Sequence, residues 1–372
     1  MKLILGVDAI NPPLTGIGRY TWELAKHYAT YDYGFESVRY FSSGKWITDP
    51  SALLERKLDH SVGNRVRKFL RPPVAVRKWH LRRAMRDSLF HSPNYFLPES
   101  AAAGVVTIHD LSVFKYPETH PGERLRHFER SFASTLSRSS HLITDSEATR
   151  DEVSSFIGWA KEKITAVHLG VSSEFHPYET AALVEPLGRT GLSPGAYTLC
   201  VSTLEPRKRI DRLLDAYSQL AVGVRRAYPL VLAGSTGWLN DSLQDKIARG
   251  ETEGWLRYLG FVPELLLPLL YAGARAFFLP SLYEGFGLPV LEALASGVPT
   301  LTSNSSSLPE VAGGAAWLVE PDDHLALLNG IEKVICDDVW RATAIIKGFD
   351  VTKEMTWERC ARQTAAVYKT LN

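Results

Sequence analysis

Short apolar and β-branched runs alternate with amphipathic stretches along most of the chain. In the first half, six runs predict buried strands: Leu3–Asp8, Ser37–Phe41, Leu89–Ser92, Val105–His109, His141–Asp145 and Ile164–Leu169. Helical periodicity lies between them, over Gly18–Thr30, Glu123–Arg138 and Glu147–Phe156. A second series of strands follows: Tyr197–Val201, Leu230–Ala233, Leu256–Leu259, Ala276–Leu279, Thr300–Thr302 and Ala316–Val319. Because these strands are almost continuously apolar, we expect parallel sheets with helices on both faces.

The strand series is interrupted once, over residues 172–196. This segment is dense in proline and glycine and shows neither the strand nor the helix period, so it predicts a linker between two domains. The chain length of 372 residues agrees with two domains. Two doubly wound domains that face each other would form a cleft at the carboxyl ends of their strands.

Composition narrows the classes of function. The chain has 42 Lys and Arg against 41 Asp and Glu, a net charge of +1 that removes the electrostatic argument for a nucleic-acid binder. Its three cysteines lie far apart and fit a reducing compartment, and no Cys or His pair has metal-ligand spacing. The first apolar run is too short for a signal peptide, and prolines and charges interrupt residues 259–283, which therefore do not predict a membrane span. We expect a soluble, cytoplasmic protein.

Two motifs of the first half follow predicted strands. Gly16 and Gly18 open a helix after the first strand, where backbone N–H groups can approach an anion. The third glycine of the dinucleotide fingerprint is absent, since Thr21 stands there, and the glycines could serve turn geometry alone. His109 ends the strand Val105–His109 and would point into the cleft to bond a substrate or share a proton. The alternative is a satisfied core histidine.

Two motifs of the second half carry charge. Arg207 and Lys208 follow the first strand of that half and can hold a diphosphate without a metal, although surface salt bridges are the alternative. Glu284 and Glu292 stand eight residues apart, a spacing that chance also supplies. Their context predicts ligand binding, because Glu284 lies in a glycine-rich loop after a strand and a helix begins near Leu288. Carboxylates suit sugar hydroxyls because each accepts two hydrogen bonds.

A local excess of positive charge remains. Residues 60–86 contain no acidic residue but nine basic ones: Arg65, Arg67, Lys68, Arg71, Arg77, Lys78, Arg82, Arg83 and Arg86. Val74, Leu81 and Met85 form a narrow apolar stripe within this segment. One interpretation is a solvated surface helix; the other is a face that meets anionic lipid headgroups or a diphosphate-bearing acceptor.

The sequence Glu284-Gly-Phe-Gly-Leu-Pro-Val-Leu-Glu292 resembles the E-x7-E signature of the retaining GT-B glycosyltransferases of family 4. Further segments agree with that family in their order along the chain: Gly16–Tyr20, His109–Ser112, Asp145-Ser146, Glu205–Lys208, Gly260–Val262 and Ser296–Pro299. The resemblance implies an acceptor-binding Rossmann-like domain at 1–175, a linker at 176–196, a nucleotide-sugar-binding Rossmann-like domain at 197–356, and a C-terminal helix at 357–372 that packs back on the first domain. One departure is Ser202-Thr203, where many relatives have Gly-Arg.

The resemblance also implies roles for individual residues. His109 would contact the donor sugar and the acceptor, while Arg207 and Lys208 would neutralise the departing nucleotide diphosphate. Glu284 and the backbone of Phe286, Gly287 and Leu288 would hold the sugar. Glu292 would bind the ribose, and Val262 the base. Gly16 and Gly18 would lie against the diphosphate. Such enzymes retain the anomeric configuration and need no metal or other cofactor.

The residues of the Glu205–Lys208 and His109–Ser112 segments are most similar to the corresponding segments of bacterial mannosyltransferases of lipopolysaccharide O-antigen or capsule synthesis. It implies a GDP-sugar donor, mannose or a 6-deoxy relative such as rhamnose, and a polyprenyl-diphosphate-linked glycan acceptor. The basic segment would then place the hexosyltransferase peripherally at the inner face of the cytoplasmic membrane. The alternatives are a UDP-sugar-dependent transferase (glucosyl, galactosyl or N-acetylhexosaminyl), a nucleotide-sugar epimerase, a sugar-binding protein and a peripheral scaffold.

Overall fold

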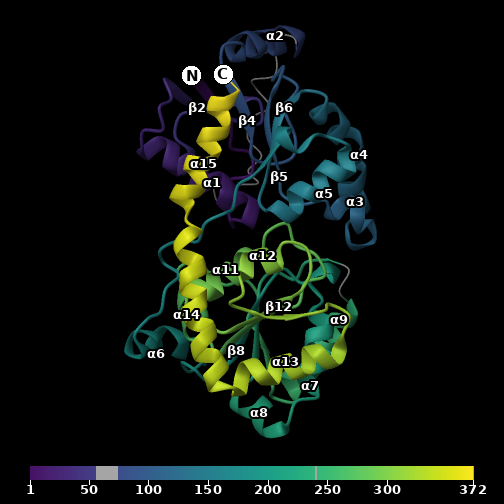
Figure 1. The fold of residues 1–372 in the computed structure, drawn as a ribbon, viewed down its shortest axis with the longest axis vertical. Coiled ribbons are helices and arrows are strands. Elements are labelled where there is room, and N and C mark those ends of the chain that lie inside the picture. The colour runs from purple at the N-terminus through teal and green to yellow at the C-terminus, as the bar shows by residue number, and fades with distance from the viewer. Residues whose placement is uncertain (56–73, 239–240, 372) are drawn as a thin grey trace, which may run out of the picture.

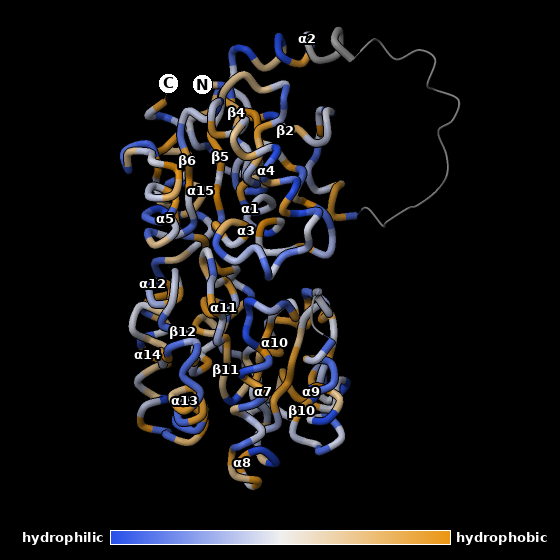
Figure 2. The backbone as a smooth tube through the Cα atoms, turned by 90° about the vertical axis from the view of Figure 1, so that its right-hand side faces the viewer, coloured by the Kyte–Doolittle hydropathy of each residue, from blue (hydrophilic) through white to orange (hydrophobic). Residues whose placement is uncertain are grey.

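The computed structural model describes residues 1–55, 74–238 and 241–371 and shows two α/β halves stacked end to end (Figure 1). Each half holds one largely parallel sheet with helices on its faces. Hydrophobic strand segments lie inside each half, and hydrophilic segments lie mainly on outer helices and loops (Figure 2). The predicted architecture of two Rossmann-like sheets is confirmed.

Within the described residues, the first sheet has the strand order β3-β2-β1-β4-β5-β6-β7. Its strands are β1 (Lys2–Gly6), β2 (Ser37–Ser42), β3 (Lys45–Ile47), β4 (Leu89–Ser92), β5 (Gly104–Ile108), β6 (Ser139–Thr144) and β7 (Ile164–Ala166). Its helices are α1 (Gly16–Thr30), α2 (Val74–Met85), α3 (Ser112–Lys115), α4 (Gly122–Leu136) and α5 (Glu147–Ile157). Because β1 pairs with β2 on one side and β4 on the other, the strand order reverses beside β1.

The hairpin of β2 and β3 is the antiparallel exception in this sheet, and the sequence pattern does not predict β3. Three residues are too few to show the strand alternation. Ser43 and Gly44 form the turn with φ values of 49° and 79°, the left-handed conformation that a tight hairpin needs. Asp8 anchors this turn to the end of β1, since its Oδ1 accepts a hydrogen bond from the Ser43 N–H at 2.6 Å.

The described part of the second half forms a parallel sheet in the order β10-β9-β8-β11-β12-β13. Its strands are β8 (Thr198–Val201), β9 (Leu230–Ala233), β10 (Leu256–Tyr258), β11 (Ala276–Leu279), β12 (Thr300–Ser303) and β13 (Trp317–Val319). Its helices are α7 (Ile210–Ser218), α8 (Val222–Ala227), α9 (Asp241–Thr252), α10 (Leu267–Ala272), α11 (Leu288–Ala295), α12 (Leu308–Ala312), α13 (His324–Cys336) and α14 (Asp338–Glu354). The order reverses between β8 and β11, as it does beside β1 in the first sheet.

The segment 176–196, which predicts a linker, contains helix α6 (Thr180–Gly188). Its Leu183 and Leu187 are buried. A Cβ added at Gly273, next to α10, would lie only 2.4 Å from Leu187 Cδ1, so α6 packs tightly on the second half. Pro186 inside the helix and the glycines around it obscure the helical period, which is why the sequence pattern does not reveal α6.

Helix α15 (Trp357–Thr370) runs from the second half back onto the first, where it packs on α1 (Figure 1). The Tyr28 hydroxyl donates to the Ala361 carbonyl at 3.0 Å. The Tyr368 hydroxyl lies 2.6 Å from His91 Nδ1 on β4. One cluster of buried apolar side chains extends from β1 and α1 through α15 to α11, so the two halves share a core.

Candidate active site

The carboxyl ends of the two sheets face each other, and the loops that follow the strands meet between the halves (Figure 1). The loop after β11 reaches the first half, where a Cβ added at Gly285 would lie 1.8 Å from the backbone oxygen of His109. Only glycine allows this approach. Two of the predicted site segments, one from each half, are therefore in direct contact.

Glu284 is the centre of a buried group of charges in this loop. Its Oε1 accepts hydrogen bonds from Lys208 Nζ at 2.5 Å and from Ser281 Oγ at 2.7 Å, and its Oε2 lies 3.3 Å from Arg207 Nη1. Burial alone would raise the pKa of the Glu284 carboxyl, but the charges of Lys208 and Arg207 hold it below its ordinary value. The structure thus brings Glu284, which is ionised, together with Arg207 and Lys208, which lie 77 and 76 positions earlier in the sequence.

Both terminal nitrogens of Arg207 donate hydrogen bonds within the protein. Nη2 donates to Glu205 Oε1 at 2.7 Å, and Nη1 donates to the Tyr283 carbonyl at 2.5 Å as well as facing Glu284. Burial opposes the charge, yet the carboxylates of Glu284, Asp110 and Glu205 raise the pKa of Arg207 above its ordinary value. Arg207 therefore stabilises the Glu284 loop. To bind a phosphate with both terminal nitrogens, it would first have to break these hydrogen bonds. Its diphosphate role stays a prediction.

His109 is fixed between two acceptors. Its Nδ1 lies 2.7 Å from Asp145 Oδ2, and its Nε2 lies 2.7 Å from the Pro93 carbonyl oxygen. Because a carbonyl only accepts, Nε2 carries a proton and donates it to Pro93. Burial would lower the pKa of the ring, but Asp145 and the Pro93 carbonyl raise it above the ordinary histidine value. This arrangement holds the ring in one orientation, and neither ring nitrogen is an unoccupied proton acceptor.

Two helix N-termini lie next to each other beside these charges. A Cβ added at Gly16, where α1 begins, would lie 3.6 Å from Leu288 Cδ1, where α11 begins. Gly287 precedes α11 with φ of 112°, a left-handed conformation that directs the chain into the helix. A Cβ at Gly18 would lie 2.8 Å from the Ala9 carbonyl, so glycine is needed there for packing. Unpaired N–H groups and the positive ends of two helix dipoles suit an anion.

Two models of protein families match the chain: "Glycosyltransferase Family 4" over residues 14–175 and "Glycosyl transferases group 1" over residues 192–348. The O-antigen chain mannosyltransferase B of Escherichia coli is 39% identical over 383 aligned residues that span 100% of both chains. The chain belongs to glycosyltransferase family 4. This glycosyltransferase is also 26% identical to the O-antigen chain mannosyltransferase RfbU of Salmonella typhimurium, over 62% of this chain and 60% of that one.

Solved structures share the fold of this glycosyltransferase. HepE of Anabaena in complex with UDP-glucose matches with a TM-score of 0.74 at 18% identity, over 100% of both chains. WaaG, described as a glycosyltransferase involved in lipopolysaccharide biosynthesis, matches with a TM-score of 0.70 at 15% identity, over 99% of both chains. At these identities the likeness establishes the GT-B fold and nothing finer.

Glu292 of the glycosyltransferase lies within α11, partly buried between the halves. Burial raises its pKa to about 7, while the Tyr271 hydroxyl and the Arg19 charge act in the opposite direction. Arg19 pairs with Glu264 at 3.1 Å, and Glu264 follows Val262 in the loop after β10. The structure thus places Glu292 and Val262 in one region at the carboxyl edge of the second sheet. Their contacts to ribose and base stay predictions.

The basic segment lies elsewhere. Helix α2 stands at the end of the first half that is remote from the second half (Figures 1 and 2). Arg82 and Arg83 are exposed there; Arg82 Nη2 donates to the Glu99 carbonyl at 3.3 Å, and Arg83 lies over the Trp79 ring. Arg65, Arg67 and Lys68 lie outside the described residues, and Arg77 and Lys78 lie in α2 without described side chains. The structure does not bring Arg82 and Arg83 together with the cleft residues.

No role was predicted from the sequence for three side chains of the site. The Tyr283 hydroxyl accepts from the Leu111 N–H at 3.1 Å and donates to Glu152 at 2.6 Å. Ser146 and Thr149, at the start of α5, donate to the Gly285 carbonyl at 2.8 and 3.0 Å. These bonds seat the Glu284 loop on the first half. The Asp145-Ser146 pair after β6 was the available signal for one of them.

Two further observations bear on partners. No helix in residues 1–55, 74–238 or 241–371 combines the length and apolar composition needed to cross a bilayer. Over the same residues, no three His, Cys, Asp or Glu side chains gather in the manner of metal ligands. Independence from metals and other cofactors stays a prediction.

Proposed function

We propose that this glycosyltransferase is an O-antigen mannosyltransferase, which moves mannose, or a 6-deoxy relative such as rhamnose, from a GDP-sugar to a polyprenyl-diphosphate-linked glycan with retention of configuration. The observation that carries the proposal is the 39% identity, along the full length of both chains, to the O-antigen chain mannosyltransferase B of Escherichia coli. The charge group around Glu284 at the meeting point of the halves supplies the chemistry such a transfer needs.

The donor would lie across the carboxyl edge of the second sheet. Glu292 accepts hydrogen bonds from the ribose, and the base meets the backbone at Val262. The diphosphate lies against the start of α11 and Lys208, whose Nζ is 2.5 Å from Glu284 Oε1. Negative charge that develops on the leaving diphosphate is stabilised by Lys208 and the helix N-termini, which are in place before the reaction. Glu284 and the backbone of residues 286–288 hold the sugar.

The acceptor hydroxyl must lose its proton during the transfer. His109 Nε2 already donates to the Pro93 carbonyl, and Nδ1 faces Asp145, so the ring is a poor candidate for the general base. This supports a front-face displacement in which an oxygen of the departing diphosphate takes the proton. His109 then shapes the site and contacts the sugars.

The first experiment is a panel of nucleotide sugars: GDP-mannose, GDP-rhamnose, UDP-glucose, UDP-galactose and UDP-N-acetylglucosamine. We expect thermal stabilisation and slow release of GDP with a GDP-sugar alone. Lys208→Ala should reduce GDP release about 100-fold, and NMR of the product should show the donor's anomeric configuration. Lys246→Ala is the matched control, because Lys246 pairs with Asp215 at 2.6 Å on the outer helices α7 and α9. Release of UDP alone would contradict the GDP assignment.

We also propose that α2 contacts anionic lipid. Arg82 and Arg83 are exposed at one end of the molecule, next to the exposed Trp79, and such arginines attract anionic headgroups. The double variant Arg82→Glu, Arg83→Glu should lose sedimentation with phosphatidylglycerol vesicles. The control is Arg189→Glu, Arg226→Glu, which reverses two exposed arginines of the second half. Equal sedimentation of both variants would contradict the proposal.

A further inference from the structure

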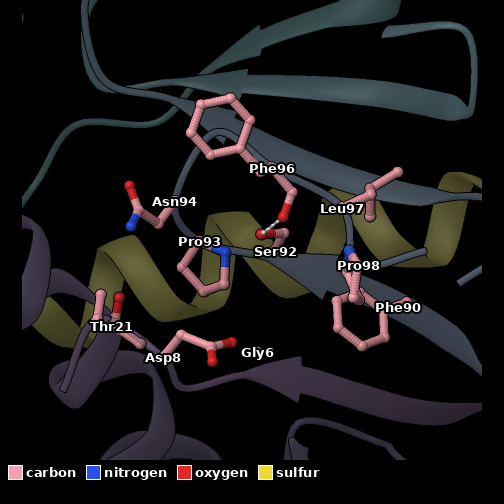
Figure 3. A pocket seen from close by; sticks show the side chains of 11 residues that line it. Gly6, Asp8, Thr21, Phe90, Ser92, Pro93, Asn94, Phe96, Leu97 and Pro98 are labelled. Atoms are coloured by element: carbon pink, nitrogen blue, oxygen red, sulfur yellow. Dashed lines mark hydrogen bonds between the residues drawn. The ribbon is translucent and has the colours of Figure 1, made fainter. Parts of the chain in front are cut away.

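The loop after β4 turns sharply at Tyr95, a residue for which no sequence motif predicts a role. Tyr95 has a φ of 52°, in the left-handed region that a bulky side chain rarely adopts. The Phe96 N–H donates to the Asn94 carbonyl at 2.5 Å, so Tyr95 is the central residue of a tight three-residue turn. The Ser92 hydroxyl bonds across the same turn to the Phe96 carbonyl at 2.8 Å (Figure 3). A strained residue persists only where the surrounding contacts hold it.

Those contacts are made with the end of β5, where His109 and Asp110 follow the strand. The Tyr95 N–H donates to the Thr107 carbonyl at 3.0 Å, and the Tyr95 hydroxyl accepts from the Asp110 N–H at 3.0 Å. The Pro93 carbonyl accepts from His109 Nε2 at 2.7 Å. The turn therefore bonds to three residues at the end of β5, and Tyr95, which is only 2% exposed, makes two of these bonds.

Two tyrosine rings also pack against the imidazole of His109. The Tyr95 ring meets it nearly edge to face, with the ring centroids 5.6 Å apart and the ring planes at 72°. The Tyr20 ring of α1 meets it in a similar way, at 5.3 Å and 84°. The Tyr20 ring is itself fixed, because its hydroxyl lies 3.0 Å from Thr107 Oγ1. Both rings therefore limit the rotation of the imidazole about its side-chain bonds.

The segment that Tyr95 holds is also the surface against which the Glu284 loop of the second half lies. A Cβ added at Gly285 would lie 1.8 Å from the His109 carbonyl oxygen and 3.0 Å from Asp110 Cβ. Contacts as close as these leave no room for the two backbones to shift independently. A displacement of the Asp110 backbone would therefore be transmitted to the loop that carries Glu284.

We propose that Tyr95 is a positioning residue for the transfer reaction, which fixes the His109 imidazole and the Asp110 backbone in the orientation that the sugar site requires. The inference rests on the proposed function, because it takes His109 to contact the transferred sugar. Tyr95 is buried, so it acts through His109 and Asp110 and not on the substrate. A glycine would relieve the strain of the turn, but it would supply neither the ring nor the hydroxyl.

The test compares Tyr95→Phe with Tyr95→Leu in the full chain. Tyr95→Phe removes the acceptor of the Asp110 N–H, so exchange of that amide with water should accelerate about tenfold. It keeps the ring against His109, so the His109 ring protons should exchange as in the wild type. Tyr95→Leu removes the ring as well, and exchange of the His109 Nε2 proton should accelerate about tenfold. Hydrogen exchange with mass spectrometry measures the amide. NMR of protein labelled with ¹⁵N-histidine measures the ring proton, and His109→Asn assigns its signal.

Kinetics of GDP-mannose hydrolysis connect the orientation to the reaction. We expect kcat to fall about tenfold in Tyr95→Phe and about 100-fold in Tyr95→Leu. KM should stay within about twofold, because the contacts to the nucleotide are unchanged. Tyr217→Phe is the matched control, since it removes a buried hydroxyl that lies 2.9 Å from Thr198 Oγ1 in the second half. It should leave kcat, the Asp110 amide and the His109 ring proton unchanged, even where it lowers the free energy of unfolding.

Two results would overturn the inference: unchanged exchange of the His109 ring proton in Tyr95→Leu, or a kcat in Tyr95→Phe that equals the wild-type value while the Asp110 amide exchanges faster. The second result decides the question even where Tyr95→Leu does not fold. Failure of the donor assignment is separate, because it would appear in the nucleotide panel as UDP release, and the exchange and NMR measurements need no donor.

Discussion

Glu310, on α12 of the second half, accepts a hydrogen bond from His168 Nε2 of the first half at 2.5 Å. The same carboxylate accepts from the backbone N–H groups of Glu147 at 2.8 Å and Ala148 at 3.1 Å, which begin α5. One side chain of the second half thus caps a helix of the first, and the same helix N-terminus holds the Gly285 loop through Ser146 and Thr149. This contact therefore links the two halves directly.

Glu310→Ala should loosen the boundary between the halves. Loss of the cap leaves two backbone N–H groups unpaired, so exchange of the Glu147 and Ala148 amides should accelerate about tenfold. Hydrogen exchange followed by mass spectrometry measures this, with Glu332→Gln as the control at an exposed position of α13.

Although burial acts in the opposite direction, the bonds to Glu310 lower its pKa. The cap therefore contributes stability that is lost only as pH falls below the ordinary glutamate range, and unchanged exchange in Glu310→Ala would contradict this role.

Gly285→Ala should disrupt the meeting of the halves more severely. Its Cβ would lie 1.8 Å from the His109 carbonyl oxygen, so the Glu284 loop must move away from the first half. A displacement of about 1 Å at a reacting centre costs about 100-fold in rate, and we expect kcat to fall by at least that factor. Steady-state kinetics measures it. Gly223→Ala, in open space on α8, should leave kcat unchanged.

Glu292 makes stability depend on pH near neutrality. Its pKa is raised to about 7, so between the ordinary glutamate range and pH 7 the folded chain keeps a proton that the unfolded chain has released. The free energy of unfolding should therefore fall as pH rises through this window and become flat above it. Glu292→Gln should remove this component. Urea unfolding at pH 5 to 8 measures both proteins, and parallel pH profiles would refute the assignment.

The bond between Tyr368 and His91 fastens α15 to the first half. Tyr368→Phe removes the hydroxyl that lies 2.6 Å from His91 Nδ1 and leaves a buried ring nitrogen unpaired, at a cost of about 1–2 kcal/mol in the free energy of unfolding. Burial lowers the pKa of His91 to about 3, so the ring is neutral and the loss should be the same from pH 5 to 8. Chemical denaturation measures it. Tyr31→Phe, at a ring that is 60% exposed, should cost nothing measurable.

Local periodicity in the sequence was sufficient to predict the strands of the two sheets other than β3. Strands such as β5 and β11 are buried on both faces, so a continuous apolar run marks them without any knowledge of their neighbours. The charged motifs at the strand ends could be found for a similar reason, because the end of an apolar run marks the edge of the sheet. The ordered motifs from Gly16 to Pro299 indicate the family without any knowledge of the geometry.

Tertiary structure decided what those motifs touch. Both terminal nitrogens of Arg207 donate hydrogen bonds to the Glu205–Glu284 side of the site, namely to Glu205 and the Tyr283 carbonyl. His109 is held between Asp145 and the Pro93 carbonyl. The spacing of residues along the sequence predicts none of these contacts. The hairpin strand β3 was also beyond the sequence, because three residues are too few to show a period. Helix α6 was missed because Pro186 and the glycines around it obscure its period. Periodicity records which face of an element is buried, whereas a partner tens of residues away along the chain is chosen only when the chain closes into its fold.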